Sequence, residues 1–413
     1  MHHFARRGSA LWAEDVPLSD IADAVGTPFY AYSAATLRRH ARVFKEGLAG
    51  TDALVAFSVK ALSNLSVLRL LAREGLGADI VSGGELARAR RAGIAPDRIV
   101  FSGVGKTTDE IDAAIAAGIL QFNAESEAEL RRLSARAGAA GRTARVALRV
   151  NPEVDAGTLD GISTGRPDDK FGVPWDRAEA FYDLAGALPG LETHGVDVHI
   201  GSQITALAPF EAATRRAADL VARLRARGHV IDTLDLGGGL GVPYGDGVTP
   251  PEPAAYLHVI REITDGLGVR LIFEPGRMIA ANAGVLVTSV ILTKRQRDRA
   301  FCVVDAGMND LIRPALYKAR HGIEAVAPRG GEAGLYDVVG PVCESTDLFA
   351  RDVALTDPQE GDRLAILSAG AYGAVQSSGY NTRMLVPEVL VDGTDWRVVR
   401  RRPSVDEVLA LED

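Results

Sequence analysis

Residues 233–241, TLDLGGGLG, join a short strand-like run directly to three consecutive glycines. A strand that ends in such a triplet is typical of a tight strand-to-helix turn, where the backbone must pass close to other atoms. The runs on either side have the same form: GVDVHI at 195–200 is followed by Gly-Ser, and RLIF at 270–273 by Glu-Pro-Gly-Arg. Three such runs in succession predict neighbouring parallel strands with special residues at their carboxyl ends.

The same alternation extends back to about residue 35, with short apolar runs separated by helical stretches rich in Ala, Arg and Leu. It predicts eight parallel strands joined by helices, which close into a (β/α)8, TIM-type barrel. The expected strands are Ala53–Val59, Ala78–Val81, Arg98–Phe101, Leu120–Asn123, Arg145–Val150, Gly195–Ile200, Thr233–Leu236 and Arg270–Phe273. The expected helices include Leu65–Arg73, Glu85–Ala92, Thr108–Ala117, Ser126–Ala137 and Phe210–Arg227.

After Ala283 the pattern changes to strand-like runs separated by Gly, Pro and Asp turns. These runs are Val285–Leu292, Phe301–Val304, Arg363–Leu367, Glu388–Val391 and Trp396–Arg401. We therefore expect an α/β chain in which the barrel, residues 35–282, is followed by a mostly β barrel or sandwich domain formed by residues 1–34 and 283–413. The loop at 158–170 is rich in Gly, Asp and Thr and is expected to be mobile.

The composition argues against several classes of partner. A net charge of −8 and a pI near 5.6 give no electrostatic reason to bind nucleic acid or an anionic membrane. The longest uncharged stretch, 278–293, is shorter than the ~20 apolar residues of a spanning helix. Two cysteines cannot form a disulfide framework, and the charged start does not resemble a secretory peptide. We expect a cytoplasmic protein with a small-molecule ligand.

The residues best suited to chemistry fall at the carboxyl ends of the expected strands, which form one rim in this fold. Closely spaced glycines let backbone N–H groups approach an anion, and an arginine beside a glycine adds a cation suited to phosphate or carboxylate. The candidates on the rim are Lys60, Arg149, His199, Ser202, Gly238, Gly239, Glu274, Gly276 and Arg277.

A lysine at a barrel mouth can form a Schiff base with an aldehyde, and a phosphorylated aldehyde would also occupy the anion site. Pyridoxal 5'-phosphate meets this description. Glu274 would then keep the pyridinium nitrogen protonated, and His199 would pack on the ring face. Singly, a solvated lysine, a glycine turn and a structural histidine are the commoner interpretations. Their coincidence on one rim favours the cofactor.

Ordered motifs across nearly the whole chain resemble the fold-type III pyridoxal-phosphate decarboxylases, in which a barrel is followed by a β domain. The motifs are AFSVKALSN around Lys60, GADIVSGGEL at 77–86, FSGVGKT at 101–107, LRVNP at 148–152, HIGSQ at 199–203, LGGGLG at 236–241, EPGR at 274–277, DAGMNDLIRPALY at 305–317, GPVCES at 340–345 and GAYG at 370–373. Within this family RPALY, CES and GAYGAVQSSGYNTR resemble the diaminopimelate decarboxylases. One departure is Ala61-Leu62, where the family is expected to have Ala-Asn.

The resemblance implies decarboxylation of meso-2,6-diaminopimelate to L-lysine and CO2, the last step of lysine biosynthesis. It assigns catalytic roles to Lys60, His199 and to Cys343 as the acid that reprotonates the α-carbon. It also implies a homodimer in which the Cys-Glu segment reaches the neighbouring subunit's site. The residues implied to bind substrate are Arg277, Arg313 and Tyr317 at the distal carboxylate, Glu344 at the distal ammonium, and Tyr372, which would touch both substrate and cofactor.

Other functions remain open from the sequence. A decarboxylase of another amino acid, or of a siderophore or antibiotic intermediate, would share the cofactor residues. An alanine-racemase-like enzyme would need a base on each face of the substrate and would release no CO2. A non-catalytic cofactor-binding relative is usually a barrel alone. A phosphate-ligand-binding barrel would have no Schiff base. No metal site is expected.

Overall fold

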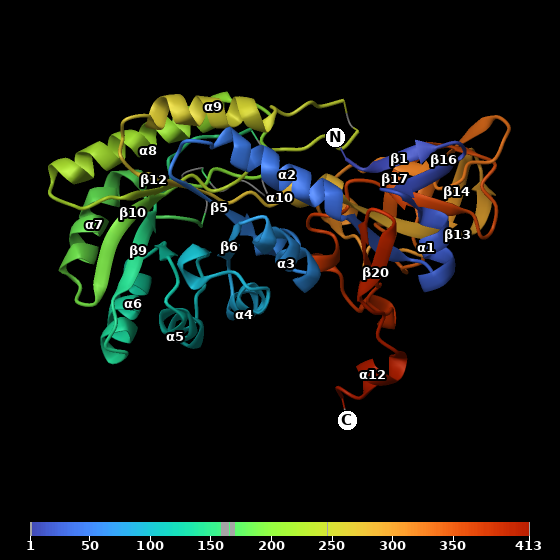
Figure 1. Ribbon diagram of the computed structural model, residues 1–413. Coiled ribbons are helices and arrows are strands. Elements are labelled where there is room, and N and C mark those ends of the chain that lie inside the picture. Colours follow the sequence, from blue (N-terminus) through green and yellow to red (C-terminus); the bar gives the residue numbers. More distant parts are fainter. Residues whose placement is uncertain (1, 158–164, 166–169, 246, 413) are drawn as a thin grey trace. The chain divides into compact units, whose positions relative to one another are not determined.

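The computed structural model describes residues 2–157, 165, 170–245 and 247–412 (Figure 1). Most of the loop at 158–170, expected to be mobile, lies outside the described residues. The chain divides into two compact units. The barrel unit comprises residues 40–242 and 249–278, and the β unit comprises residues 1–39, 243–248 and 279–413.

The barrel unit is a closed barrel of eight parallel strands, as the sequence predicts. Each strand pairs with its sequence neighbours, and β12 closes the barrel by pairing with β5 in the register Leu271↔Ala53. Every expected barrel strand is confirmed, with ends shifted by a few residues. The strands are β5 (Ala53–Ser58), β6 (Gly77–Ile80), β7 (Ile99–Phe101), β8 (Gln121–Ala124), β9 (Ala144–Arg149), β10 (Leu191–Asp197), β11 (Thr233–Asp235) and β12 (Arg270–Phe273).

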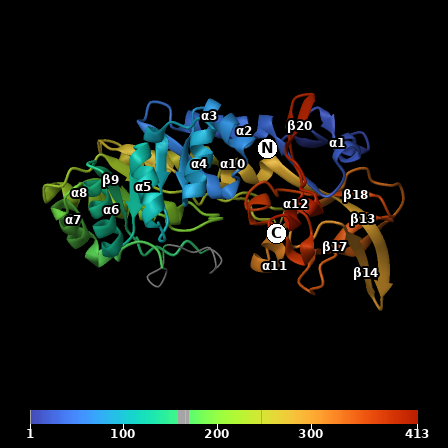
Figure 2. The ribbon, with the colours of Figure 1, turned by 90° about the horizontal axis from the view of Figure 1, so that it is seen from below.

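Helices lie outside these strands, as both ribbon views show (Figures 1 and 2). Several begin at a side chain that caps the first turn: Asn64, Ser82, Thr107 and Ser126 each accept a backbone N–H. The caps fix where each strand-to-helix loop ends. The helices of this part are α2 (Ala34–Gly47), α3 (Leu65–Arg73), α4 (Gly83–Arg91), α5 (Thr108–Ala117), α6 (Glu127–Ala139), α7 (Ala178–Ala187), α8 (Ala208–Ala226), α9 (Pro253–Thr264) and α10 (Arg277–Ala280).

The β unit is built on a nine-stranded sheet, which confirms the expected mostly β domain. The 13-residue strand β13 (Gly284–Gln296) pairs along its length with three others, β4 (Phe29–Ser33), β14 (Arg299–Val304) and β18 (Arg363–Ile366). The remaining strands of the sheet are β15 (Ile323–Ala325), β16 (Ala333–Val339), β17 (Leu348–Thr356), β19 (Glu388–Asp392) and β20 (Asp395–Arg400).

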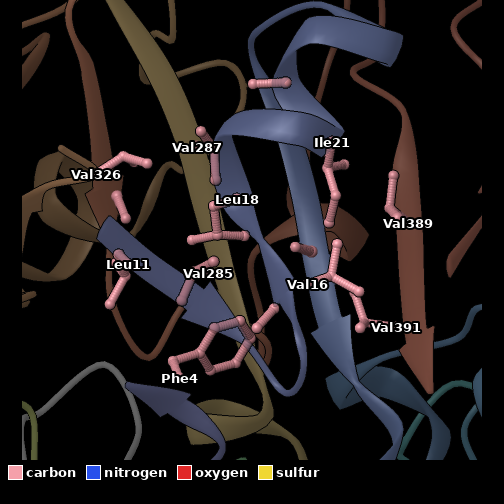
Figure 3. Close-up of a cluster of buried hydrophobic side chains, with 14 of the residues drawn as sticks. Phe4, Leu11, Val16, Leu18, Ile21, Val285, Val287, Val326, Val389 and Val391 are labelled. Atoms are coloured by element: carbon pink, nitrogen blue, oxygen red, sulfur yellow. The ribbon is translucent and has the colours of Figure 1, made fainter. Parts of the chain in front are cut away.

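The N-terminal segment supplies a second layer of the β unit. Three short strands, β1 (Phe4–Arg7), β2 (Ala10–Ala13) and β3 (Val16–Pro17), form a separate sheet that is followed by helix α1 (Leu18–Val25). Their apolar side chains meet those of β13 and β19 in one buried cluster (Figure 3). Two short helices complete the unit, α11 (Arg313–Tyr317) and α12 (Val405–Leu409).

Strands β16 and β17 were missing from the sequence expectation because charged residues interrupt them. Asp337 lies within β16 and is almost fully buried. Arg299 and Arg351 each donate to its Oδ2, at 2.8 and 2.9 Å. A charge that is paired across strands is compatible with a buried strand position, although it disrupts the apolar pattern that predicts one. Among the described residues, no helix is long and apolar enough to cross a membrane.

The close approach of β9, β10 and β11 at Gly195 gives a direct test of the barrel packing. A Cβ at Gly195 would lie 2.2 Å from Thr233 Oγ1 and 2.9 Å from the Ala147 Cβ. Gly195→Ala should therefore lower the unfolding free energy by about 1–3 kcal/mol, the usual effect of overpacking. Thermal denaturation measures this change.

The matched control is Gly138→Ala on α6, where an added Cβ meets nothing within 4 Å. That variant should melt at or slightly above the wild-type temperature, because alanine favours the helix by up to about 1 kcal/mol. Equal melting temperatures for Gly195→Ala and the wild type would contradict the described packing.

Candidate active site

The rim residues that the sequence predicts lie at the carboxyl ends of the barrel strands. Lys60 lies in a 3₁₀ turn directly after β5, and Arg149 is the last residue of β9. His199 follows β10, and Glu274 follows β12. Because parallel strands of a closed barrel end on one rim, the structure brings the whole predicted barrel set to the same end. The set also includes Ser202, Gly238, Gly239, Gly276 and Arg277.

Lys60 is held by an ion pair at the barrel mouth. Its Nζ lies 2.8 Å from Oδ2 of Asp79, a residue of β6 that is fully buried. Ser58 Oγ lies 2.8 Å from the same oxygen. The Lys60 side chain is 35% exposed, whereas that of Asp79 is 0% exposed. The buried Asp79 carboxylate therefore orients the Lys60 amine, and the Lys60 side chain remains partly accessible to solvent.

The Glu274 carboxyl lies among polar side chains inside the barrel. Ser102 Oγ donates to its Oε1 at 3.1 Å. Asn123 Nδ2 lies 3.4 Å from that oxygen and 3.1 Å from Oδ2 of Asp235. Asp235 in turn accepts the Gly237 backbone N–H at 3.0 Å. These contacts link three strands and the glycine turn to one carboxyl.

Burial keeps the carboxyls of this network protonated. Desolvation, followed by the charges of Asp235 and Asp79, raises the pKa of Glu274 well above its usual range. Burial, with the nearby Asp197, also raises the pKa of Asp235 to about 8. Nearby cations oppose the shift at Glu274 without cancelling it. Both shifts favour the protonated form of these carboxyls.

His199 is a neutral ring in a fixed orientation. Burial, followed by the charges of Arg149 and Lys60, lowers its pKa well below the usual value. The Gly238 N–H donates to Nδ1 at 3.1 Å, so the ring proton is on Nε2. A Cβ at Gly237 would lie 2.3 Å from Nδ1, and only glycine permits this approach. Gly238, expected beside the cofactor, thus uses its N–H to orient the histidine.

The side of the rim that we expect to bind an anion contains a serine, an arginine and a glycine turn. Nη2 and Nε of Arg277 donate to Ser202 Oγ at 2.8 and 3.3 Å. Gly239 has φ +107°, and a Cβ there would lie 2.6 Å from the Gly201 carbonyl oxygen. The Gly201 carbonyl oxygen therefore leaves no room for a side chain at Gly239.

Arg149 provides a second buried cation. Its Nη1 donates to Glu125 Oε1 at 3.3 Å, and Glu125 Oε2 accepts the Gly172 N–H at 2.9 Å. The guanidinium carbon lies 4.8 Å from the centre of the Phe171 ring. Nη2 is buried, and within the described part of the chain it has no hydrogen-bond partner. A buried donor of this kind suits an acceptor atom of a bound ligand.

These features fit a phosphorylated aldehyde such as pyridoxal phosphate. The accessible amine of Lys60 suits the aldehyde, and the protonated Glu274 carboxyl suits a ring nitrogen. The glycine turn and Arg277 suit the phosphate. The Nη2 donor of Arg149 supplies further polar contact. The donor set of the barrel unit therefore agrees with the cofactor predicted from the sequence.

The remaining predicted residues lie in the β unit, in two groups. Arg313 and Tyr317 begin and end α11, and Gln376 Nε2 lies 3.5 Å from the Tyr317 hydroxyl. Tyr372 has φ +55°, in the left-handed region. It belongs to the 370–373 turn, in which a Cβ at Gly373 would lie 2.4 Å from the Ala369 carbonyl oxygen.

Cys343 and Glu344 form the second group, on an exposed segment between β16 and β17. The Cys343 N–H donates to Asn381 Oδ1 at 3.4 Å, and the Cys343 side chain is exposed. Glu344 accepts hydrogen bonds from Tyr380 and Thr346. These bonds, with the Tyr380 contribution the larger, lower the pKa of Glu344. Its carboxylate stays charged and suits a cationic ligand group.

Sequence reasoning missed the residues that support the predicted ones. They share one signal: each is a polar residue inside, or directly after, a barrel strand that otherwise reads as apolar. GADIV at 77–81 and FSG at 101–103 carried this signal within motifs that had already been noticed. The missed barrel residues are Asp79, Ser102, Asn123, Glu125, Asp197 and Asp235.

Comparison with known proteins gives matches over nearly the whole chain. The family model for the pyridoxal-binding domain of pyridoxal-dependent decarboxylases matches residues 34–281. A diaminopimelate decarboxylase of Vibrio cholerae is 52% identical over 97% of this chain and 96% of its own length. One from Pseudomonas aeruginosa is 52% identical, over 100% of this chain and 99% of its own.

A solved structure with the same fold comes from Helicobacter pylori. It is a diaminopimelate decarboxylase complexed with L-lysine, and it superposes with a TM-score of 0.92 at 40% identity. The match covers 96% of this chain and 99% of that one. The similarity therefore includes both compact units.

Asp197 provides a test of the buried carboxyl network. Burial, then Glu274, raises its pKa well above the usual value, and within the described residues its Oδ1 has no hydrogen-bond partner. A raised folded-state pKa means that the stability from this carboxyl is complete below about pH 3.9, the unfolded value, and is lost as pH rises through the folded value. Asparagine is neutral throughout.

The melting temperature of Asp197→Asn relative to wild type should therefore rise between about pH 5 and about pH 9, by about 3 °C or more. Differential scanning calorimetry of both proteins across this range measures the trend. Asp298→Asn, at an exposed turn, is the control and should show no such trend. A pH-independent difference for Asp197→Asn would contradict the assignment of a neutral buried carboxyl.

Proposed function

The chain belongs to the pyridoxal-dependent decarboxylases, and we propose that it is a diaminopimelate decarboxylase that converts meso-2,6-diaminopimelate to L-lysine and CO2. The observation that carries this function is 52% identity to such enzymes over 97–100% of the chain. The match spans the barrel unit, which carries the cofactor residues, and the β unit, which carries the RPALY and CES segments.

We assign the two parts different tasks. Residues 35–282 bind pyridoxal phosphate, and residues 1–34 with 283–413 complete the active site and form the dimer interface. When bound, the cofactor supplies an aldehyde that condenses with amines and a ring that accepts the electron pair left after CO2 departs. We assign the Lys60 amine to the aldehyde. Ser202, Gly239, Gly276 and Arg277 are assigned to the phosphate, and Gly238 lies beside it with its N–H on His199.

The barrel unit also sets the positions of protons around the ring. Glu274, whose pKa burial raises, would share a proton with the ring nitrogen. His199, neutral and fixed by the Gly238 N–H, packs on the ring face. Arg149 adds positive charge at the buried end of the site, where its Nη2 needs an acceptor. Glu274, His199 and Arg149 are thus fixed in place before the substrate binds.

The far end of diaminopimelate is itself an amino acid, so it needs cations and an anion together. We assign Arg277, Arg313 and Tyr317 to its carboxylate and Glu344 to its ammonium. Arginine binds carboxylates with paired N–H donors, and the Glu344 carboxylate stays charged because of its hydrogen bonds. Tyr372 contacts both substrate and cofactor. A substrate without a distal carboxylate would leave Arg313 without its anion.

Cys343 is the acid that returns a proton to the α-carbon after CO2 leaves, and its thiol is the donor. A thiol can act as a general acid when it is positioned beside the reacting atom. Cys343 is exposed in the single chain, whereas a closed active site prevents unwanted proton exchange with bulk water. We propose that a second copy of the chain covers this segment in a homodimer with shared active sites. We propose that the reaction takes place in the cytoplasm.

The substrate assignment predicts which amino acid releases CO2. The purified protein with pyridoxal phosphate should release CO2 and L-lysine from meso-diaminopimelate, and no CO2 from ornithine, arginine or lysine, because only the first has a distal carboxylate and ammonium together. Coupled CO2 measurement with amino-acid analysis reads the result. Release from ornithine or arginine would overturn the substrate, and no release from any of the four would overturn the decarboxylase.

Shared active sites predict complementation between two inactive variants. Mixed Lys60→Ala and Cys343→Ala dimers, allowed to exchange subunits, should recover about a quarter of wild-type activity, because half the dimers are mixed and each has one intact site. Decarboxylation before and after exchange measures this recovery. The control pair, Lys60→Ala with Glu274→Gln, has both changes in the barrel unit and should recover none. Verified exchange without recovery in the first pair would contradict a shared site.

A further inference from the structure

The side chain of Arg313 is gripped from two sides within the β unit. Its Nη1 lies 2.8 Å from His321 Nε2. Its guanidinium carbon lies 4.7 Å from the centre of the Tyr244 ring, a cation–π distance. Tyr244 and His321 also meet edge to face at 5.2 Å. All three residues are buried, at 5 to 7% exposure.

The hydrogen bonds of His321 determine its tautomer. Nδ1 lies 2.8 Å from the Leu367 carbonyl oxygen, which can only accept, so Nδ1 carries the ring proton. Nε2 then has a lone pair, and the arginine can only donate to it. One neutral tautomer therefore satisfies both contacts. A proton on Nε2 would point at the guanidinium and break the bond.

The sheet fixes the place of the His321 ring. His321 precedes β15, which pairs antiparallel with β18 in the register Ile323↔Ile366. Leu367 follows β18, and its N–H donates to the Gly322 carbonyl oxygen at 2.8 Å. His321, which accepts the hydrogen bond from Arg313, is therefore held by paired strands and not by a free loop. Rotation of the ring away from Arg313 would cost the bond to Leu367.

We propose that His321 is a positioning residue that orients Arg313 for the distal carboxylate of the substrate and thereby sets the selectivity for it. This inference rests on the proposed function. The histidine and the tyrosine ring are uncharged partners, so they restrict the rotamers of the long arginine side chain without cancelling its charge. A preoriented guanidinium loses less conformational entropy when it binds a carboxylate. The distal carboxylate is remote from the reacting carbon, so the gain appears in binding more than in the chemical step.

Two substitutions separate this role from a purely structural one. His321→Asn places an amide near the Nδ1 position, where it can still donate to Leu367, but it does not reach Arg313. His321→Gln places an amide oxygen near the Nε2 position, where it can accept from Arg313. A positioning role predicts that the glutamine variant is the better of the two. A role limited to holding the Leu367 segment predicts the reverse order.

The experiment compares ligands with and without the carboxylate. Equilibrium binding of L-lysine and of 1,5-diaminopentane to the cofactor-loaded protein is measured by calorimetry for wild type and both variants, with turnover of meso-diaminopimelate in parallel. In His321→Asn the Kd of L-lysine and the KM should each rise roughly 10-fold, the effect of losing a hydrogen bond to a charged group. The Kd of 1,5-diaminopentane and kcat should change by less than about twofold. His321→Gln should recover part of the loss.

The outcomes separate the inference from the proposed function. Unchanged L-lysine binding in His321→Asn, or an equal loss for both ligands, overturns the positioning role even if the wild type turns over diaminopimelate. Suppose instead that the Kd of L-lysine rises from wild type to His321→Gln to His321→Asn, but the wild type releases no CO2 from diaminopimelate. That result overturns the proposed reaction and leaves the positioning of Arg313 supported.

Discussion

The ion pair between Lys60 and Asp79 is the interaction on which the rest of the site depends. Asp79 is completely buried, and an isolated charge there would be costly to desolvate. Its partner is the Lys60 amine at the barrel mouth, 2.8 Å away. The amine that compensates the buried carboxylate is therefore also the group that a ligand can reach. Removing either partner would leave the other charge uncompensated, which usually destabilises a protein strongly. Stability and function therefore depend on the same contact.

The same desolvation explains the protonation of the other groups. Among the described residues, the carboxyls around Glu274 outnumber the cations that oppose their pKa shift, Lys60 and Arg149. Burial therefore raises the pKa of Glu274 and Asp235, whereas burial and those cations lower the pKa of His199. The Glu274 carboxyl, with its raised pKa, and the His199 imidazole, with its lowered pKa, lie on the same rim. This pair suits a ligand ring with a basic nitrogen. The closed barrel, through solvent exclusion, sets both states.

The sequence was sufficient for features that repeat or lie close together in the chain. Eight strand-like runs predicted the barrel, and residues at their ends, such as Lys60 and Glu274, predicted the rim. Partners that depend on strand register could not be read in this way. Asp79 meets the Lys60 turn because β5 and β6 pair in the register Ser58↔Asp79, and His321 meets Arg313 through the β15–β18 ladder. Strand β16 was missed because its buried Asp337 is neutralised by arginines from elsewhere in the chain.

The claim that the barrel rim around Lys60 binds the cofactor covalently can be measured directly. The cofactor-loaded protein is reduced with borohydride, digested, and its pyridoxyl-lysine peptide identified by mass spectrometry. We expect one labelled lysine, Lys60, and no label on Lys106, which is buried and paired with Glu129 at 2.7 Å. A label on another lysine, or a bound cofactor with no labelled lysine, would contradict the account.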